Sequence, residues 1–333
     1  MKFLIAGFGS IGRRHFRNLK ALGHSDIILY RTGKSTLPVD EIENVPVYYS
    51  LDEALDHKPD AVIVANPTAN HLEVALKAAQ CGCHLFLEKP ISHKLDGISE
   101  LVKSVSENQI HVLVGYQFRY HPGILMIKQL LGDGTAGRPL SFRAEWGEYL
   151  PAWHPWEDYR KSYTSLRALG GGVVLTLSHP IDYLHWLFGE ISDLWAFSGK
   201  VSDLEIEVED YAEAGLRFGS GVVGSLHLDY FQRPAVHKLE ISTTVGKILW
   251  DNADGSTRFY SAEADQWQSY DLPAGFERND LFLAQTRHFV DVIQGKALPI
   301  CSLEDGIDAL KVALAIYRAS SSKSLVKIGS IGA

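Results

Sequence analysis

The 333-residue sequence contains no apolar run of about 18 residues, the length that a helix needs to cross a bilayer. The apolar run that follows Met1 and Lys2 covers only about five residues, which is too short for the core of a secretory signal. At roughly 100 to 200 residues per domain, the length predicts about two domains that each bury a core. We therefore expect a soluble chain that has no membrane partner.

Cysteine is also scarce, and the three that are present, Cys81, Cys83 and Cys301, cannot form a closed disulfide framework. Neither a second cysteine pair nor a regularly spaced histidine pair accompanies them, as a zinc site would require. We interpret them as buried or incidental thiols and predict no metal site. This cysteine usage fits a reducing, cytoplasmic environment.

Positive charge is in deficit, because 32 basic side chains stand against 40 acidic ones and the formal net charge is −8. A negative field repels nucleic-acid phosphates and anionic lipid surfaces, so we expect neither as a partner. The charge balance does not exclude a small anionic ligand that is held by a local group of basic residues.

The first part of the chain alternates short β-branched runs with helical patterns, which is typical of a parallel sheet covered by helices. The expected strands are 3–6, 26–30, 47–49, 60–65, 84–87 and 111–115, and the expected helices are 11–22, 69–81 and 96–107. These elements predict a doubly wound α/β domain of the Rossmann type over residues 1–120.

From about Pro139 the pattern changes to longer alternating runs joined by short turns that contain glycine, which indicates an antiparallel sheet. The expected strands are 140–148, 194–200, 211–218, 221–230, 237–243 and 246–251, followed by helices 279–293 and 304–320 and a short strand 325–327. We predict a second domain over residues 121–333, of the α+β class, with a large and mostly antiparallel open sheet.

A glycine motif directly follows the first strand and opens the first helix. Its residues are Gly7, Phe8, Gly9, Ser10, Ile11 and Gly12. In this position the first glycine permits a tight turn, the second lets the backbone approach a pyrophosphate, and the third lets the helix pack on the strand. The helix N-terminus adds amide donors and a positive dipole. We predict a dinucleotide site here, and a chance glycine loop is the alternative.

The end of the second strand lacks the acidic residue that would bind the ribose 2′-hydroxyl of NAD(H). It carries Arg31, Thr32 and Lys34 instead, which offer two cations and a hydroxyl to a 2′-phosphate. We therefore predict NADP(H) as the favoured cofactor and NAD(H) as the alternative. In the competing interpretation, Arg31 and Lys34 form an ordinary solvated turn.

Two later strand ends are expected to complete the pocket, because ligands of open α/β sheets bind at the carboxyl ends of strands. Asn66, Pro67 and Thr68 follow the fourth strand and lead to His71, whereas Glu88 and Lys89 follow the fifth strand. Thr68 is equally suited to capping a helix. Lys89 is placed to polarise a substrate oxygen, and a solvated ion pair with Glu88 is the alternative.

Five motifs stand in a defined order along the chain: G-F-G-S-I-G, A-N-P-T-x-x-H, E-K-P, G-Y-Q-F-R-Y-H-P at 115–122 and G-G-G-V-V-L-T-L-S-H-P-I-D at 170–182. Their order and spacing resemble the Gfo/Idh/MocA oxidoreductase family over essentially the whole chain. The resemblance implies a Rossmann domain followed by an α/β domain whose open sheet often mediates self-association. It also implies metal-free hydride transfer between a nicotinamide and a sugar, cyclitol or related carbonyl carbon.

Carried over by position, the resemblance implies that Lys89 contacts both the nicotinamide ribose and the reacting substrate oxygen. It implies that His179 is the general acid/base, a role that suits an imidazole near neutral pH. We also include Gln117 in the predicted cofactor site. For His179, a structural histidine on a helix is the competing interpretation.

Two positions depart from the motif of many relatives, since Thr176 replaces an aspartate and Pro180 replaces a glutamate. Without the acid, His179 lacks an obvious carboxylate to fix its tautomer. Asp182 is retained, and it could either orient the histidine or bind a substrate hydroxyl.

The segment 149–167 is dense in aromatic and basic side chains, which offer platforms to sugar rings and donors to hydroxyls or an anion. The predicted substrate-binding residues are Trp153, His154, Tyr159, Arg160 and Tyr163, together with Arg119, Tyr120 and Asp182. They suggest a hydroxylated substrate, and an acidic or nucleotide-linked form of it is one of the options. A surface patch for subunit contact is the competing interpretation.

Two functions from different classes follow. The first is an NADP-dependent sugar or cyclitol oxidoreductase that forms a homodimer or homotetramer through its second domain. The second is an NADP-binding sensor or scaffold that has lost turnover, which the departures at Thr176 and Pro180 motivate. Retention of Lys89 favours the enzyme, and reduction of an imine or a C=C bond is a further alternative.

Overall fold

The computed structural model describes residues 1–33, 42 and 44–332. The chain forms two compact units, and neither is a single stretch of sequence. The first comprises Met1–Gln117 and Glu277–Ile307, and the second comprises Phe118–Phe276 and the residues from Asp308 onward. The order of elements along the sequence therefore conceals that residues 277–307 pack with the N-terminal part.

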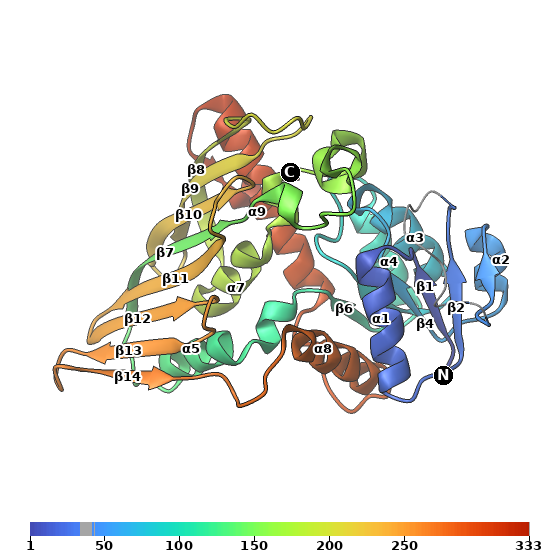
Figure 1. The fold of residues 1–333 in the computed structure, drawn as a ribbon, viewed down its shortest axis with the longest axis horizontal. Helices are drawn as coiled ribbons and strands as arrows, with labels where there is room; N and C mark the ends of the chain where they lie inside the picture. Colours follow the sequence, from blue (N-terminus) through green and yellow to red (C-terminus); the bar gives the residue numbers. More distant parts are fainter. Residues whose placement is uncertain (34–41, 43, 333) are drawn as a thin grey trace. The chain divides into compact units, whose positions relative to one another are not determined.

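A six-stranded parallel sheet forms the centre of the first unit (Figure 1). Its strands are β1 (Phe3–Ala6), β2 (Ile27–Tyr30), β3 (Val47–Tyr48), β4 (Ala61–Val64), β5 (His84–Leu87) and β6 (Val112–Val114). They lie in the order β3-β2-β1-β4-β5-β6. This is the doubly wound order that places a ligand crevice at the carboxyl ends of β1 and β4, and it confirms the predicted parallel α/β class.

The helices of the first unit cover this sheet, and β1 and β4 are buried at every position because both of their faces are covered. The helices are α1 (Ser10–Ala21), α2 (Leu51–Asp56), α3 (His71–Gln80), α4 (Ile98–Glu107) and α8 (Arg278–Ile293). Helix α8 packs on α1, where the guanidinium of Arg14 lies 4.3 Å from the ring centre of Phe282. The short helix α2 was not predicted, although Ser50 caps it by accepting from the backbone N of Glu53.

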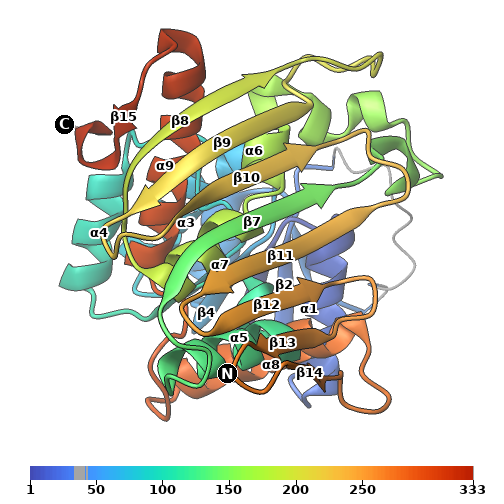
Figure 2. The same ribbon diagram turned by 90° about the vertical axis from the view of Figure 1, so that its left-hand side faces the viewer.

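A nine-stranded sheet forms the second unit (Figure 2). Its strands are β7 (Pro139–Gly147), β8 (Ile191–Gly199), β9 (Tyr211–Phe218), β10 (Val223–Asp229), β11 (Val236–Thr243), β12 (Gly246–Asp251), β13 (Thr257–Ser261), β14 (Gln266–Tyr270) and β15 (Val326–Lys327). They lie in the order β14-β13-β12-β11-β7-β10-β9-β8-β15, in which only β7 and β10 pair in parallel. The predicted, mostly antiparallel sheet is confirmed, whereas β13 and β14 were not predicted.

Helices of the second unit lie behind one face of this sheet in Figure 2. They are α5 (Pro122–Gly132), α6 (Val173–Thr176), α7 (His179–Phe188) and most of α9 (Leu303–Ser322). Burial alternates along β9, as expected for a strand with one face on a core and one in solvent. Within the described ranges, no helix is both long enough and apolar enough to cross a membrane.

Candidate functional site

The glycine loop between β1 and α1 is packed too closely to carry side chains at two of its positions. Gly7 has a φ of +101°, and a Cβ built there would lie 2.6 Å from the backbone N of Asn66. A Cβ at Gly12 would overlap the carbonyl oxygen of Gly7. At Gly9, by contrast, no described atom lies within 4 Å of the corresponding position, so a ligand has room to approach the backbone there.

The N-terminus of α1 is suited to an anion. This helix, which the structure describes in full, has no side-chain cap at Gly9 and no acidic residue in its first turn. Its first amide N–H groups and its dipole therefore favour a negatively charged group beside Ser10 and Ile11. The residues present thus fit the pyrophosphate of a dinucleotide.

Two cations lie beside the same loop. The guanidinium of Arg31, just after β2, lies 5.7 Å from the ring centre of Phe8, and that of Arg13 lies 5.1 Å from it. Thr32 follows and is exposed, whereas Lys34 lies outside the described residues. Phe8 is 3% exposed. Its ring therefore supports the two arginine side chains, and its backbone is part of the glycine loop.

In the loop after β4, Asn66 has a side-chain acceptor that is available to a ligand, whereas the His71 ring is buried against the backbone. Asn66 donates from Nδ2 to the carbonyl oxygen of Asn70, while its buried Oδ1 accepts no hydrogen bond from any described residue. Thr68 is buried and opens a 3-10 helix after Pro67. His71 is 2% exposed, and its ring is enclosed by backbone carbonyls. Asn66 Oδ1 is thus the group of this loop that fits a ligand hydroxyl.

Glu88 and Lys89, which follow β5, differ in burial and in their contacts. Glu88 is buried, and its Oε1 lies 2.7 Å from Nε2 of His15 on α1. Its Oε2 also accepts from the backbone N of Lys89 at 3.3 Å. Lys89 is partly exposed, and Gln117 is buried at the start of the 3-10 helix η3 (Gln117–Tyr120). His15 was not singled out from the sequence. Its position on the buried face of α1 was the feature that could have indicated a buried polar contact.

In the second unit, His179 is the first residue of α7 and is 2% exposed. Its ring centre lies 5.1 Å from that of Phe118 and 5.5 Å from that of Trp146. Two further imidazoles, His121 and His237, contact Phe118 as well. His179 thus lies in a cluster of aromatic and imidazole rings that the sequence did not reveal.

Burial determines the charge of the two other histidines in this cluster. It lowers the pKa of His121 to about 4 and that of His237 well below its usual value, to which the nearby His121 also contributes. His121 Nδ1 also accepts from the backbone N of Gly123 and caps α5. Both rings are therefore neutral near pH 7, and both contact Phe118, on which His179 also packs.

Arg119 and Asp182, which were both predicted to bind substrate, bind each other. Each is 1% exposed, and Arg119 donates from Nη2 to Asp182 Oδ1 at 2.7 Å and from Nε at 3.1 Å. The guanidinium also lies 5.4 Å from the ring centre of Trp186. This buried pair joins η3 to α7, whose first residue is His179. The predicted contacts of Arg119 and Asp182 with substrate stay predictions.

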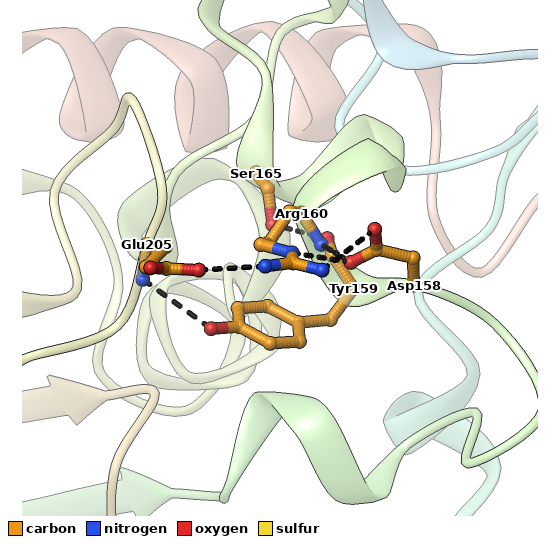
Figure 3. A network of polar contacts seen from close by, with 5 residues as sticks. All are labelled: Asp158, Tyr159, Arg160, Ser165 and Glu205. Atoms are coloured by element: carbon orange, nitrogen blue, oxygen red, sulfur yellow. Dashed lines mark hydrogen bonds and ion pairs between the residues drawn. The ribbon is translucent and has the colours of Figure 1, made fainter.

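Arg160, another predicted substrate residue, is matched by two carboxylates (Figure 3). It donates from Nε to Asp158 and from Nη1 to Glu205, each at 2.7 Å, and these two contacts raise its pKa. The hydroxyl of Tyr159 accepts from the backbone N of Glu205 (Figure 3). These contacts tie the aromatic segment to the loop before β9.

The remaining predicted substrate residues lie along the same segment. Trp153 packs edge-on against Tyr230, and the ring of His154 lies 5.4 Å from that of Trp156. A cavity of about 10 Å³, room for about one water molecule, is lined by Leu150, Trp153, His154, Glu157, Tyr159 and Ser162. The structure thus brings Trp153, His154 and Tyr159 together, whereas Tyr163 is 37% exposed and Tyr120 is partly exposed.

Comparison with known families assigns both parts of the chain. Residues 1–116 match the oxidoreductase family with an NAD-binding Rossmann fold, and residues 124–249 match the GFO/IDH/MocA C-terminal domain. The chain belongs to the Gfo/Idh/MocA family. The family and the NAD(P)-dependent oxidoreductase class that the motifs indicated are thereby confirmed.

Several Gfo/Idh/MocA proteins match over most of their length. Myo-inositol 2-dehydrogenase of Thermotoga maritima is 27% identical over 351 residues, covering 99% of each chain. The 1,5-anhydro-D-fructose reductase of Ensifer adhaerens is 26% identical over 304 residues, covering 89% of this chain and 84% of that protein. The structure of a levoglucosan dehydrogenase with NADH and L-sorbose shares the fold, with a TM-score of 0.87, 20% identity and full coverage of both chains.

Proposed function

We propose that this protein transfers a hydride between a nicotinamide cofactor and a carbonyl or hydroxyl carbon of a sugar, cyclitol or sugar-derived substrate. The observation that carries the proposal is the position of Lys89 directly after β5, in the same parallel sheet whose β1 leads into the glycine loop. The carboxyl ends of parallel strands meet at one edge of a sheet. An ammonium is therefore available at the edge where the dinucleotide site lies.

The chemistry divides between two residues. When bound, the nicotinamide supplies or accepts the hydride. In the direction of reduction, the Lys89 ammonium stabilises the negative charge that develops on the substrate oxygen, and His179 donates the proton that this oxygen takes up. In oxidation, His179 accepts the hydroxyl proton. The roles of both residues follow from their positions in the family motifs.

The proposed substrate is a hydroxylated ring. Relatives named for myo-inositol, levoglucosan and 1,5-anhydro-D-fructose support this class. In this chain Trp153, His154 and Tyr159 carry aromatic faces and polar edges within one segment, the side-chain types that suit the apolar face and hydroxyl rim of such a ring. An acidic or nucleotide-linked form of this substrate stays part of the proposal.

NADP(H) is the proposed cofactor, with NAD(H) as the alternative. The support is the pair Arg31 and Arg13 beside Phe8, together with the absence of an acidic side chain from the described residues 31–33. Related structures with NADH favour the alternative. A cytoplasmic location is proposed from the cysteine usage.

Self-association through the nine-stranded sheet completes the proposal. On β8, Trp195 and Phe197 are 45% and 67% exposed on the face of the sheet opposite to the buried Leu194 and Ala196. Large apolar side chains that remain exposed side by side are typical of a protein interface.

A second function, an NADP-binding sensor without turnover, has one observation in its favour. Thr176 is buried on α6 where many relatives have a carboxylate that would assist His179. If the proton relay has been lost with that carboxylate, the protein binds cofactor without reducing a substrate. Reduction of an imine or a C=C bond remains the alternative within the enzyme class.

One experiment decides between these functions. The protein is incubated with NADPH or NADH and a panel of keto-sugars and inosose-type cyclitols, and in the other direction with NADP⁺ or NAD⁺ and the corresponding alcohols. Oxidoreductase activity that Lys89→Met lowers at least about 100-fold supports the enzyme. Cofactor binding without Lys89-dependent turnover on any member of the panel supports the sensor.

A further inference from the structure

His71 connects two loops of the cofactor half of the site. Its Nδ1 lies 2.8 Å from the carbonyl oxygen of Pro90, and its Nε2 lies 2.7 Å from that of Asn66. Asn66 belongs to the loop after β4, and Pro90 directly follows Lys89 in the loop after β5. At 2% exposure, the ring is shielded from water, so these two carbonyls replace its hydration.

The two contacts determine how many protons the His71 ring needs in order to donate to both carbonyl oxygens. A carbonyl oxygen accepts only, so the ring satisfies both partners only when both nitrogens carry a proton. Burial lowers the pKa of His71, whereas the two carbonyls and the Glu88 carboxylate favour its charged form and Lys89 opposes it. Burial is the largest of these influences, and the net effect lowers the pKa of His71. A neutral ring donates to one of the two carbonyls and holds the other loop through close packing.

A second buried histidine holds the other side of Lys89. His15 of α1 is 0% exposed, and its Nε2 donates to Glu88 Oε1 at 2.7 Å. Glu88 also packs closely on the backbone of Gly115, where a Cβ would lie 3.0 Å from Glu88 Oε2. The segment Glu88-Lys89-Pro90 is thus fixed at Glu88 by the glycine-motif helix and at Pro90 by His71.

We propose that His15 and His71 are positioning residues for Lys89, which hold the backbone on either side of it so that its ammonium meets the cofactor and the substrate. This inference rests on the proposed role of Lys89. The positioning role needs no contact of either imidazole with cofactor or substrate, and the predicted cofactor-binding roles of His71 and Glu88 stay predictions. A displacement of about 1 Å at a reacting group costs on the order of 100-fold in rate, so the two histidines control activity through Lys89.

A double-mutant cycle tests the proposal on the full-length protein. Dissociation constants for NADPH and NADH are measured by fluorescence titration for the wild type, His71→Leu, Lys89→Met and the double variant, and kcat and KM are measured where turnover exists. With Lys89 present, His71→Leu is expected to weaken cofactor binding about tenfold and, where turnover exists, to lower kcat by about 10- to 100-fold. With Met at position 89, the same substitution should have less than a twofold effect. The cycle for His15→Leu should give the same result.

A matched control separates positioning from general packing. His84→Leu changes a half-buried histidine at the amino end of the same strand, β5, where His84 Nδ1 accepts from the backbone N of His111. It is expected to leave cofactor affinity and kcat within twofold of the wild type. His71→Gln, which keeps one amide donor, replaces His71→Leu in the cycle if the leucine variant does not fold, as judged by circular dichroism.

Failure of the positioning role can be distinguished from failure of the proposed function. If no panel substrate is turned over, the proposed function fails, and the cycle on cofactor affinity still tests the positioning role. Equal effects of His71→Leu in the two Lys89 backgrounds, or no effect in either readout, overturn the inference. A control variant His84→Leu that is as impaired as His71→Leu overturns it as well.

Discussion

At the scale of single residues, Arg31 is the side chain that most directly tests the choice of cofactor. It lies beside Phe8 at the glycine loop, and a guanidinium there would pair with a 2′-phosphate. Replacing Arg31 by alanine should raise the KM for NADPH by about 10- to 100-fold, as expected when a hydrogen bond to a charged group worth about 1.5–3 kcal/mol is lost. The KM for NADH should change less than about threefold. Steady-state kinetics with both cofactors measures the difference.

The control for this variant removes a cation at the opposite end of α1 from the glycine loop. Lys20 is exposed in the last turn of α1. Lys20→Ala should leave both KM values unchanged. An Arg31→Ala protein whose KM for NADPH equals that of the wild type would show that Arg31 does not read the 2′-phosphate.

The ion pair of Arg119 and Asp182 makes a prediction about stability. Both side chains are 1% exposed, so Asp182→Asn leaves a buried guanidinium without its counter-charge. The free energy of unfolding should fall by about 3–5 kcal/mol, as measured by urea denaturation. Glu205→Gln, which breaks an exposed ion pair with Arg160, should cost less than about 1 kcal/mol. Equal losses for the two variants would contradict the burial argument.

The sequence predicts individual residues where the identity of the residue fixes the backbone. Gly7 and Gly12 are such positions, because the structure leaves no room for a Cβ at either. Side-chain partners are different. Arg119 and Asp182 are 63 positions apart, and His15 and Glu88 are 73 apart, so a pattern over neighbouring residues does not show that they meet. Arg119, Asp182 and Glu88 were therefore predicted as separate site residues, and His15 was not singled out.

At the scale of elements, the pairing of β9 with β10 contains a histidine between two carboxylates. Nδ1 of His227 lies 2.9 Å from Glu213 Oε2, and its Nε2 lies 2.9 Å from Asp229 Oδ2. The hydrogen bonds to Asp229 and then Glu213 raise the pKa of His227 from 6.5 to about 9. Because the folded value is the higher one, this contribution to stability is fully present below about pH 6.5 and is lost as the pH rises through about 9.

Replacing His227 by glutamine should therefore destabilise the protein at about pH 6 and have much less effect at about pH 10. Urea denaturation at the two pH values measures the change in the free energy of unfolding. His57→Gln, at an exposed position of the first unit, is the control and should change the free energy of unfolding by less than about 0.5 kcal/mol. A pH-independent effect of His227→Gln would mean that the charge of the ring does not contribute.

Helices and strands were predicted well where apolar residues form a clear pattern along the sequence. The parallel strands of the first unit are short and, apart from β3, mostly buried, and β7 to β12 alternate between a buried and an open face, so both patterns are visible in the sequence. Strand β14 is exposed along almost its whole length and joins the sheet through backbone hydrogen bonds to β13, so its side chains carry no alternation. Helix α2 has only six residues, less than two turns, and gives little periodicity.

At the scale of the whole molecule, the order of the two folds was predictable, but the composition of the units was not. Helix α8 follows β14 in the sequence, yet it packs on α1, where Asn279 donates to Asn18 at 3.0 Å. Its buried residues show that it has a core face, but the sequence does not show which core that face covers. Lys89 and His179, the two residues to which the proposed function assigns the reaction, belong to different units.

The open face of the nine-stranded sheet predicts self-association. Trp195 and Phe197 are exposed on β8, their ring centres are 6.0 Å apart, and the indole of Trp195 covers Gly215 of β9. Val223 of β10 adds a further exposed apolar side chain on the same sheet. A stable interface buries roughly 1,200–2,000 Å² in total, and we expect a second copy of the chain to cover this face.

Phe197→Glu is expected to lower the molar mass measured by light scattering after size exclusion from that of a dimer or tetramer to that of a smaller species. A carboxylate buried against a partner without a counter-charge costs several kcal/mol, enough to shift a micromolar association equilibrium more than 100-fold. Leu298→Glu is the matched control, because Leu298 is 86% exposed in the first unit. It should leave the molar mass unchanged. A wild-type protein that is monomeric at all concentrations tested, or a Phe197→Glu variant that keeps the wild-type assembly, would show that this face does not mediate self-association.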